Sequence, residues 1–368
     1  MNPGKDFIKW AEVEYDLKNN CNKYDLLRES FVHQINSVFK TMITSVNKLI
    51  TILNDRAYDY KAIYDHPNTI KSLSNEERDI NFIIGVKGMI PFFKVVLTNV
   101  IVALSKSVIN KYRVKIVIVE QDDKPQYKDF CIDNKVEYIF IPQEVCETEG
   151  MHSTALMYNI GYLFTKKPMY SIFHCADILV PHNFFDILSR SYITKNPKWL
   201  QCFTKTRVKL VSPKASEGMV QDGGKFNSAE LQDGRDLLPD PCPGAPGGSI
   251  LVKSDVFESV GGYDPELFYG YTLEDAFFWT KLECMVHEVN KIESCHCGGG
   301  KYADNPPIEI YHLQNFYNPP SSEERNKRYE EHEELWHLFA NLDHLDKMKY
   351  INAKTKIFKK QKEDLNLC

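Results

Sequence analysis

Residues 80–120 read INFIIGVKGMIPFFKVVLTNVIVALSKSVINKYRVKIVIVE, and this stretch decides the fold class. It holds two short, nearly continuous apolar runs, 80–86 and 115–120, with the length and composition of strands that are buried on both faces. The segment 90–110 between them is long and apolar enough for a helix. Two buried strands joined through a helix predict a right-handed, parallel β-α-β unit.

The same alternation continues along the chain. Short apolar runs at 137–141 (EYIFI) and 170–174 (YSIFH) follow a candidate helix or loop at 125–134 and a helical pattern at 152–165. Strands that alternate with helices predict an α/β fold, a sheet with helices on both faces. Ligands bind such sheets beyond the carboxyl ends of the strands. The first residues to consider are therefore those at the strand ends: Gly85-Val86-Lys87, Glu120-Gln121-Asp122 and His174-Cys175-Ala176-Asp177.

The flanking regions have a different pattern. Residues 24–54 carry apolar side chains three or four positions apart, which predicts a long amphipathic helix that packs on another helix or on the sheet domain, or that self-associates. A Ser cap and an acidic first turn predict a surface helix from 321 onward, and the basic tail 347–362 is expected to be solvated, with an acidic lipid surface as the alternative. These features predict three parts: a helical region 1–78, an α/β domain 79–320, and a C-terminal helix with a basic tail 321–368.

Composition excludes some classes of protein. The chain has 368 residues, 43% of them hydrophobic, and a net charge of −5, so it lacks the basic field that a nucleic-acid partner requires. It has no apolar run of roughly 18–20 residues and no signal-peptide pattern, and we therefore expect a cytoplasmic protein without a transmembrane segment. Its ten cysteines are scattered, and reduced, mostly buried thiols are expected. Residues 204–246, rich in Gly, Pro, Asp and Ser, predict a mobile active-site loop or an insertion.

Five cysteine and histidine residues between 284 and 297 could bind zinc as an alternative interpretation. Their spacing, C-x2-H-x7-C-x-C, matches none of the common structural zinc patterns. A helix end followed by a Gly-rich loop is therefore preferred. The residues concerned are Cys284, His287, Cys295, His296 and Cys297.

Three groups of residues carry possible chemistry. Asp177 closes the strand at 170–174, where a carboxylate can share a divalent cation with a diphosphate, although it could equally cap the next helix. His312 and Glu309 lie on an alternating strand, 308–312, and could complete a metal shell that Asp177 begins, whereas a lone strand histidine is more often structural. Glu274 and Asp275 open a helical segment, where two adjacent carboxylates suit proton transfer and hydroxyl binding better than a simple acidic first turn.

The order of these parts resembles the GT-A nucleotide-sugar glycosyltransferases, within them the β-1,4-galactosyltransferase-like and the polypeptide- or chondroitin-transferring enzymes. The resemblance covers roughly 80–320. It is carried by the two first strands, by HSTALMYNIGYLF with Asn159 and Gly161, by the glycine pair Gly247-Gly248, and by YGYTLEDAFFW at 269–279. Two positions depart from the family: Cys175-Ala176-Asp177 stands where the family has Asp-x-Asp, and Tyr271-Thr272-Leu273 where it has Trp-Gly-Gly or similar.

The resemblance implies a GT-A (Rossmann-like) mixed sheet and a metal-dependent transfer, with inversion, of a hexose or N-acetylhexosamine. The donor would be a UDP-sugar, the acceptor a hydroxyl of a glycan, glycoprotein or small molecule, and the cofactor Mn2+ or Mg2+. Asp275 matches the general base and Glu274 a binder of sugar hydroxyls, while Asp177, His312 and Glu309 match metal ligands. The residues matched to donor binding are Gly85, Val86, Glu120, Gln121, Asp177 and Gly248, the last where backbone passes close to the donor.

Two other functions stay open. A nucleotide-sugar-binding or scaffolding protein would explain the degenerate metal motif, with the N-terminal helix as its working surface or as the contact of a homo-oligomer. A glycosyltransferase that acts on modified DNA bases is disfavoured by the acidic balance of the chain.

Overall fold

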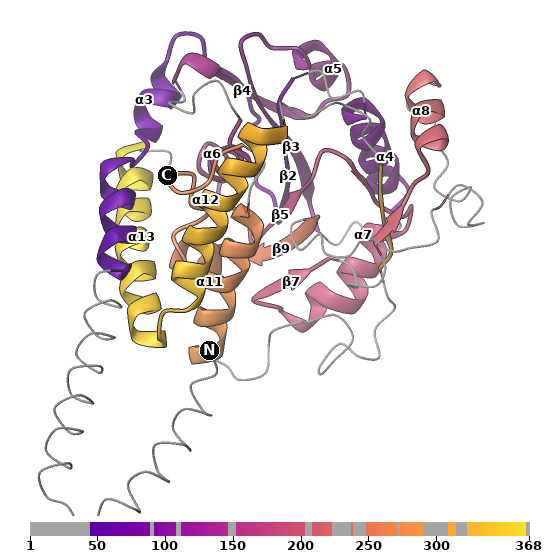
Figure 1. Cartoon of the computed structure of the whole chain (residues 1–368). Helices are drawn as coiled ribbons and strands as arrows, with labels where there is room; N and C mark the ends of the chain where they lie inside the picture. The colour runs from indigo at the N-terminus through magenta and orange to yellow at the C-terminus, as the bar shows by residue number, and fades with distance from the viewer. Residues whose placement is uncertain are drawn as a thin grey trace, which may run out of the picture.

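A seven-stranded mixed sheet lies at the centre of the protein, with the strand order β1-β4-β3-β2-β5-β9-β7 (Figure 1). The structure is a computed structural model that describes residues 45–88, 92–107, 112–145, 152–202, 208–222, 237, 248–270, 273–289, 308–313 and 322–365. The strands of this sheet are β1 (Ile70–Ser72), β2 (Ile80–Val86), β3 (Val114–Asp122), β4 (Glu137–Pro142), β5 (Tyr170–His174), β7 (Trp199–Gln201) and β9 (Ser249–Lys253).

The middle of the sheet is parallel and its edges are antiparallel. β4, β3, β2 and β5 run in the same direction, whereas β1 is antiparallel to β4, and β9 is antiparallel to both β5 and β7. Helix α4 (Phe93–Ser105) connects β2 to the parallel strand β3. The four predicted strands and the parallel β-α-β unit are therefore confirmed.

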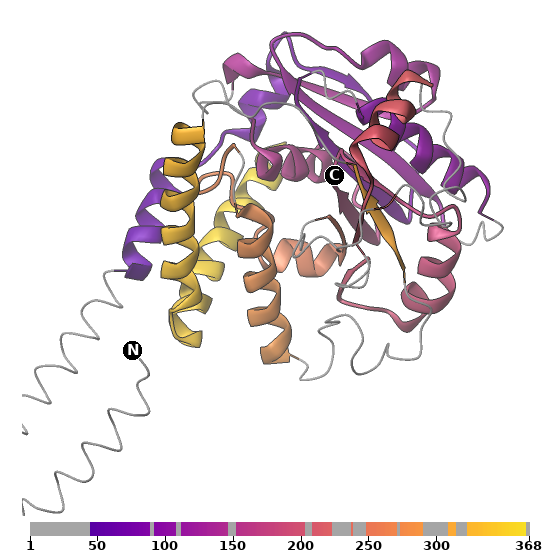
Figure 2. The same ribbon diagram turned by 45° about the vertical axis from the view of Figure 1, so that its right-hand side comes forward.

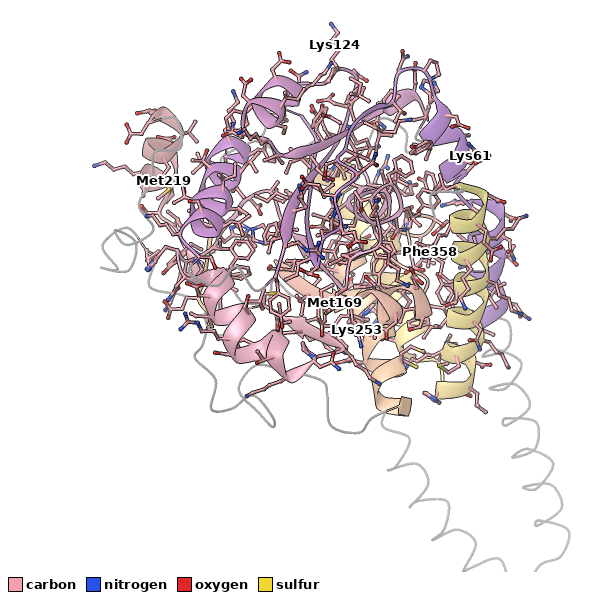
Figure 3. All side chains as sticks on the ribbon, turned by 180° about the vertical axis from the view of Figure 1, so that it is seen from behind. Lys61, Lys124, Met169, Met219, Lys253 and Phe358 are labelled. Atoms are coloured by element: carbon pink, nitrogen blue, oxygen red, sulfur yellow. The ribbon has the colours of Figure 1, made fainter. Side chains whose placement is uncertain are left out.

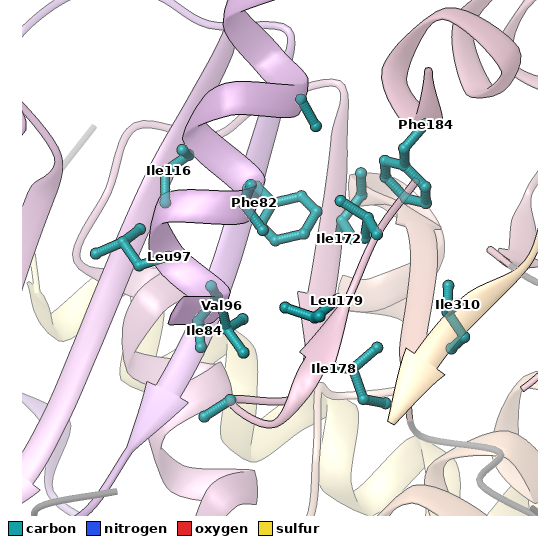
Figure 4. Packing of buried hydrophobic residues seen from close by; sticks show 14 of the residues in the cluster. Phe82, Ile84, Val96, Leu97, Ile116, Ile172, Ile178, Leu179, Phe184 and Ile310 are labelled. Carbon is teal, nitrogen blue, oxygen red and sulfur yellow. The ribbon is translucent and has the colours of Figure 1, made fainter. Parts of the chain in front are cut away.

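The alternation of side chains along β2 supplies both faces of the sheet with apolar residues. Phe82 and Ile84 pack with Val96, Leu97 and Phe184 on the face covered by α4 and α7 (Phe184–Ile187) (Figure 4). Ile83 belongs to a second cluster on the opposite face. The helices there are α3 (Tyr60–Asp65), α6 (Thr154–Leu163), α10 (Ser254–Ser259), α11 (Glu274–Val289) and α13 (His344–Leu365). The predicted α/β sheet with helices on both faces is confirmed (Figure 2).

A second, three-stranded sheet lies beside the first one. In it β10 (Ile310–His312) is antiparallel to β6 (Ile178–Leu179) and parallel to β8 (Val208–Leu210). Ile178, Leu179 and Ile310 pack into the same core as β2 and α7 (Figure 4). This sheet confirms the strand predicted at 308–312 and fixes its place next to the residues that follow β5. Within 204–246, the described residues form β8, helix α8 (Pro213–Gln221) and a bridge at Leu237.

Both end regions of the described chain pack on the sheet domain. Residues 45–55 are helical, and Val46, Leu49 and Leu53 are buried against Phe277 of α11 and Tyr350 of α13. This part of the helix predicted at 24–54 therefore packs on other helices, as one of the interpretations expected, while 24–44 lie outside the described residues. The predicted surface helix is confirmed as α12 (Ser322–Ala340).

The expectation of a solvated basic tail was wrong. Residues 347–362 belong to α13, in which Tyr350, Ile351 and Phe358 are fully buried. Figure 3 labels Phe358 on this helix. Lys354 is buried as well, and its Nζ lies 2.8 and 2.6 Å from the two carboxylate oxygens of Glu266. The many lysines of the tail concealed an apolar stripe of helical spacing, and one of those lysines pairs inside the protein.

None of the helices in the described residues combines the length and the apolar character needed to cross a bilayer. Within the same ranges, the thiols of Cys131, Cys175, Cys202 and Cys284 are free of disulfides.

Candidate functional site

The candidate site lies where β5 ends. His174, the last residue of β5, is fully buried, and its Nε2 donates a hydrogen bond of 2.8 Å to the carbonyl oxygen of Ile178. Burial lowers the pKa of His174 to about 4, so the ring is neutral near pH 7. This bond closes the turn that presents Cys175 and Asp177. The next helix, α7, begins only at Phe184, which rules out the alternative that Asp177 caps it.

The second sheet brings His312 to Asp177. Nε2 of His312 lies 3.5 Å from Oδ2 of Asp177, and both side chains are partly exposed. The backbone fixes this pair, since Leu313 N donates to Asp177 O (2.9 Å) and His312 pairs with Ile178 across the strands. The structure therefore joins the two residues that the sequence analysis coupled.

Glu309 lies apart from this pair. It precedes His312 by three residues on extended backbone, so the two side chains point to opposite sides of the strand. Burial raises the pKa of Tyr311 to about 12, and the charge of Glu309 makes a smaller contribution, so that carboxylate acts on Tyr311. Within the described ranges, no group of three His, Cys, Asp or Glu residues is arranged to hold a metal ion.

The Asp177–His312 pair fits a divalent cation that takes most of its ligands from elsewhere. Nδ1 of His312 is buried and, within the described part of the chain, has no hydrogen-bond partner. An imidazole and a carboxylate suit Mn2+, and ions of this type are commonly held by one or two protein groups together with substrate phosphates and water. The donor set thus fits an ion shared with a diphosphate better than an ion held by protein alone.

The two adjacent carboxylates, Glu274 and Asp275, begin helix α11 and are half-buried. Oδ1 of Asp275 accepts a hydrogen bond of 2.6 Å from the backbone N–H of Ala276. The N-terminus of a helix stabilises negative charge. Both acids therefore lie at the positive end of the α11 dipole.

Helix α11 is held in place by a buried cation. Nζ of Lys281 donates to the carbonyl oxygens of Val260 (3.0 Å) and Gly262 (2.6 Å) and pairs with the carboxylate of Asp264. Both side chains of this ion pair are buried, at 0% and 1% exposure. The turn 260–264 and α11 therefore form one rigid unit.

Asn159 fastens the same turn to α6. Its side chain accepts from Tyr263 N (2.8 Å) and donates to Tyr263 O (3.0 Å). Gly262 adopts φ +67°, and a Cβ there would lie 2.6 Å from Oδ1 of Asn159, so only glycine fits. The ring of Tyr263 stacks on Phe278 of α11, with centroids 3.9 Å apart.

Cys175 lies where these parts meet. Burial raises the pKa of its thiol well above the usual range, and the charges of Asp177, Asp275 and Glu274 raise it further, so all three carboxylates act on one sulfur atom. Its backbone N–H donates to the carbonyl oxygen of Gly248 (3.2 Å). The metal candidate, the acid pair and the predicted donor-binding glycine thus surround a protonated thiol.

The other predicted donor-binding residues lie at the strand ends, as expected, but two of their side chains face the protein. Glu120 is fully buried and accepts hydrogen bonds from Gln126 N (2.7 Å), Tyr127 N (3.1 Å) and Tyr138 Oη (2.5 Å). Gln121 is also fully buried, and its Oε1 accepts from Ser153 N (2.8 Å). These two side chains hold the loop after β3 and the start of α6.

Val86 and Gly85 complete the end of β2. Val86 is buried in the core. Gly85 packs closely against α6, because a Cβ at this position would lie 3.1 Å from Met157. Its lack of a side chain is thus explained by helix packing.

Two polar residues next to these positions, Lys87 and Asp122, belong to the strand ends that the sequence pointed to, although they were not matched to donor binding. Nζ of Lys87, directly after β2, donates to Oε1 of Gln143 (2.9 Å), and Oδ2 of Asp122 accepts from Gly88 N (3.1 Å). Lys87 is partly buried at the carboxyl edge of the sheet, where a cation can meet a phosphate. The signal in the sequence is their position, immediately after or at the end of a predicted strand.

Comparison with known proteins gives matches among solved structures. No family model and no curated protein matches the chain. Solved structures similar to it include GalNAc-T7 with UDP, GalNAc and Mn2+ (15% identity, TM-score 0.41, covering 67% of this chain and 46% of that one). TarS 1–349 of S. aureus in complex with UDP-GlcNAc matches with 12% identity and a TM-score of 0.41, covering 72% of this chain and 67% of that one. The mannosyltransferase PcManGT from Pyrobaculum calidifontis in complex with GDP-Man and Mn2+ matches with 11% identity and a TM-score of 0.36, covering 86% of this chain and 85% of that one. The chain thus spans less than half the length of the GalNAc-T7 structure.

Proposed function

We propose that the protein is a metal-dependent glycosyltransferase of the GT-A type that transfers a hexose or N-acetylhexosamine from a UDP-sugar to a hydroxyl acceptor, with inversion. One observation carries the proposal. The Asp177–His312 pair and the Glu274–Asp275 pair, far apart in the sequence, meet around Cys175 at the carboxyl end of β5. A cation-binding pair beside an acid pair is what the transfer of a sugar from a nucleotide diphosphate requires.

The donor would bind along the carboxyl ends of β2, β3 and β5. Lys87 supplies a positive charge for a phosphate oxygen, and the backbone at Gly88, with φ +66° and open space around it, allows close approach. The carbonyl of Gly248 is already engaged by Cys175, which fixes the backbone at this point of the donor site. Glu120 and Gln121 would act indirectly, by holding the loops that surround the nucleotide.

Asp177 and His312 would hold the divalent cation, Mn2+ or Mg2+. When bound, the cation would neutralise the charge that develops on the leaving diphosphate. The chain's own part in this is to fix a carboxylate and an imidazole 3.5 Å apart on paired backbones and to leave the remaining positions to the nucleotide and water.

Asp275 would accept the proton of the attacking hydroxyl. As the acceptor oxygen forms its bond to the anomeric carbon, the bond from that carbon to the diphosphate breaks and the hydroxyl proton moves to the carboxylate. The helix N-terminus favours the ionised form that this step needs. Glu274 would bind sugar hydroxyls. Attack opposite the leaving group inverts the configuration at the anomeric carbon.

The alternative function is a nucleotide-sugar-binding or scaffolding protein. The observation in its favour is Cys175, a protonated thiol at the position where the resembled family carries the first carboxylate of its metal motif. Such a protein would bind the same donor without turnover.

Donor hydrolysis separates the two functions. UDP release from UDP-galactose, UDP-glucose and their N-acetylamino forms would be measured with Mn2+ and with EDTA. The proposal expects Mn2+-dependent release that is lost in Asp275→Asn and in Asp177→Ala and kept in Asp129→Asn, which changes an exposed carboxylate on α5. Tight UDP binding without release from any donor would instead support the binding protein. NMR of the anomeric centre of the product tests inversion.

A further inference from the structure

The contact between α11 and α13 brings together a thiol, an imidazole and a thioether. Sγ of Cys284, on α11, lies 3.4 Å from Nδ1 of His344 and 3.9 Å from Sδ of Met348, both on α13. Cys284 is 9% exposed, whereas His344 lies at the surface. The two helices contact each other. The cluster therefore combines a buried thiol with a route from solvent.

These distances match the edges of a metal-centred polygon. Metal–sulfur bonds of about 2.3 Å and metal–nitrogen bonds of about 2.0 Å, at angles between about 110° and 120°, place ligand atoms roughly 3.5–4.0 Å apart. His344 and Met348 are four residues apart on one helix, so they share a face, and Cys284 faces them from the neighbouring helix. A single ion could contact all three groups with small movements.

We propose that Cys284, His344 and Met348 bind one monovalent copper ion, Cu+. Thiolate and thioether sulfur select soft cations, and the thioether discriminates against hard ones such as Mn2+ or Mg2+. Binding converts the Cys284 thiol to a copper-bound thiolate and releases its proton to solvent, while His344 coordinates through Nδ1 and keeps its proton on Nε2. The copper keeps its oxidation state throughout.

Charge and coordination number favour Cu+ over Zn2+. A Cu+ ion and one thiolate form a neutral unit, whereas Zn2+ with the same ligands would leave a net positive charge in a largely buried place, at an energetic cost. Structural zinc sites also take four ligands drawn from thiolates, imidazoles and carboxylates, whereas one of the groups next to Cys284 is a thioether. The sequence pattern grouped Cys284 with His287, Cys295, His296 and Cys297. Cys284 contacts α13, while the side chain of His287 and residues 290–307 lie outside the described part of the chain.

The site would be tested by titrating the full chain with Cu+ under anaerobic conditions against bicinchoninate, and with Ag+ as a redox-inert probe. The expected result is one equivalent bound per chain. Binding is lost in Cys284→Ser and His344→Ala, and Met348→Leu weakens it by at least about tenfold because one soft ligand is removed. Met169→Leu, an exposed methionine elsewhere, leaves it unchanged. Melting curves without metal show that each variant folds.

Three results would overturn the proposal. The first is a wild-type chain that binds no Cu+ or Ag+ in competition with the chelator. The second is a site that survives Cys284→Ser but is lost in the double variant Cys295→Ser, Cys297→Ser, which would move it to the other cysteines of the sequence pattern. The third is Zn2+ binding at the same place that Cu+ does not displace.

Discussion

Removal of the buried cation Lys354 should strongly destabilise the protein. Lys354 and Glu266 are both fully buried, and Nζ lies 2.8 and 2.6 Å from the two carboxylate oxygens. In Lys354→Met the aliphatic stem keeps its packing on Gly261, but Glu266 loses its counter-ion. Breaking a buried pair from one side costs about 3–5 kcal/mol, which we expect as the loss in free energy of unfolding.

The free energy of unfolding would be measured by urea denaturation at several pH values. Burial raises the pKa of Glu266 and the charge of Lys354 lowers it, so without Lys354 the carboxyl takes up a proton more readily and the loss should shrink at acid pH. Replacing both partners, Lys354→Met with Glu266→Leu, should recover most of the stability, since an apolar pair leaves no unpaired charge.

Lys349→Met is the matched control. Lys349 lies on the same helix, is 61% exposed and pairs with Asp346, so its loss should change stability far less than the loss of Lys354. If Lys354→Met costs no more than Lys349→Met, or if the double variant is less stable than Lys354→Met alone, the ion pair does not have the role argued for it.

Three further predictions concern the candidate site and its supports. The folded-state pKa of His174, about 4, lies below its ordinary value of 6.5, so the free energy of unfolding should fall by roughly 3 kcal/mol as pH falls from 6.5 to 4. His174→Asn should make the free energy of unfolding, measured by denaturation, less dependent on pH in this range. An unchanged pH dependence would argue against a neutral, buried His174. Cys175→Asp adds a carboxylate beside three others, so without metal the variant should melt at a lower temperature than the wild type. Addition of Mn2+ should raise the melting temperature of the variant more than that of the wild type, and equal increases would count against a cation at this place. Gly262→Ala should lower the free energy of unfolding by about 1–3 kcal/mol, because of the positive φ and the close contact with Asn159. Gly218→Ala, in open space on α8, should leave it unchanged or raise it by up to about 1 kcal/mol. Urea denaturation that gives the reverse order would contradict this reasoning.

The sheet was predictable because its strands are buried on both faces. Such strands read as continuous apolar runs, and 80–86 and 170–174 match β2 and β5 residue for residue. The short edge strands, in contrast, are set by tertiary contacts and leave no periodic pattern in the sequence. β1 and β7 have three residues each, too few for any pattern, and their pairing is visible only in the folded sheet. The basic tail was misjudged because residue counts weigh lysines equally, whether they face water or, as Lys354 does, a buried glutamate.

The residues of the candidate site could be selected from the sequence, but the directions of some of their side chains could not. The sequence singled out Asp177, His312, Glu274 and Asp275, and the structure gathers them around Cys175. It could not show that the carboxylate of Glu120 turns inward, because a buried acid at a strand end looks the same in sequence as one that faces a ligand. The divergence of Glu309 and His312, in contrast, follows from their three-residue spacing on the strand predicted at 308–312 and was predictable.

The three-stranded sheet has a consequence for the order in which the molecule matures. Asp177 and His312 become neighbours only when β10 pairs with β6, and that pairing closes a long loop of chain, which is slow compared with the local helix contacts. The β2-α4-β3 unit and β5 can form well before it. A chain released before residue 312 would therefore carry most of the central sheet and the Asp177 turn, yet it would have no imidazole beside that carboxylate.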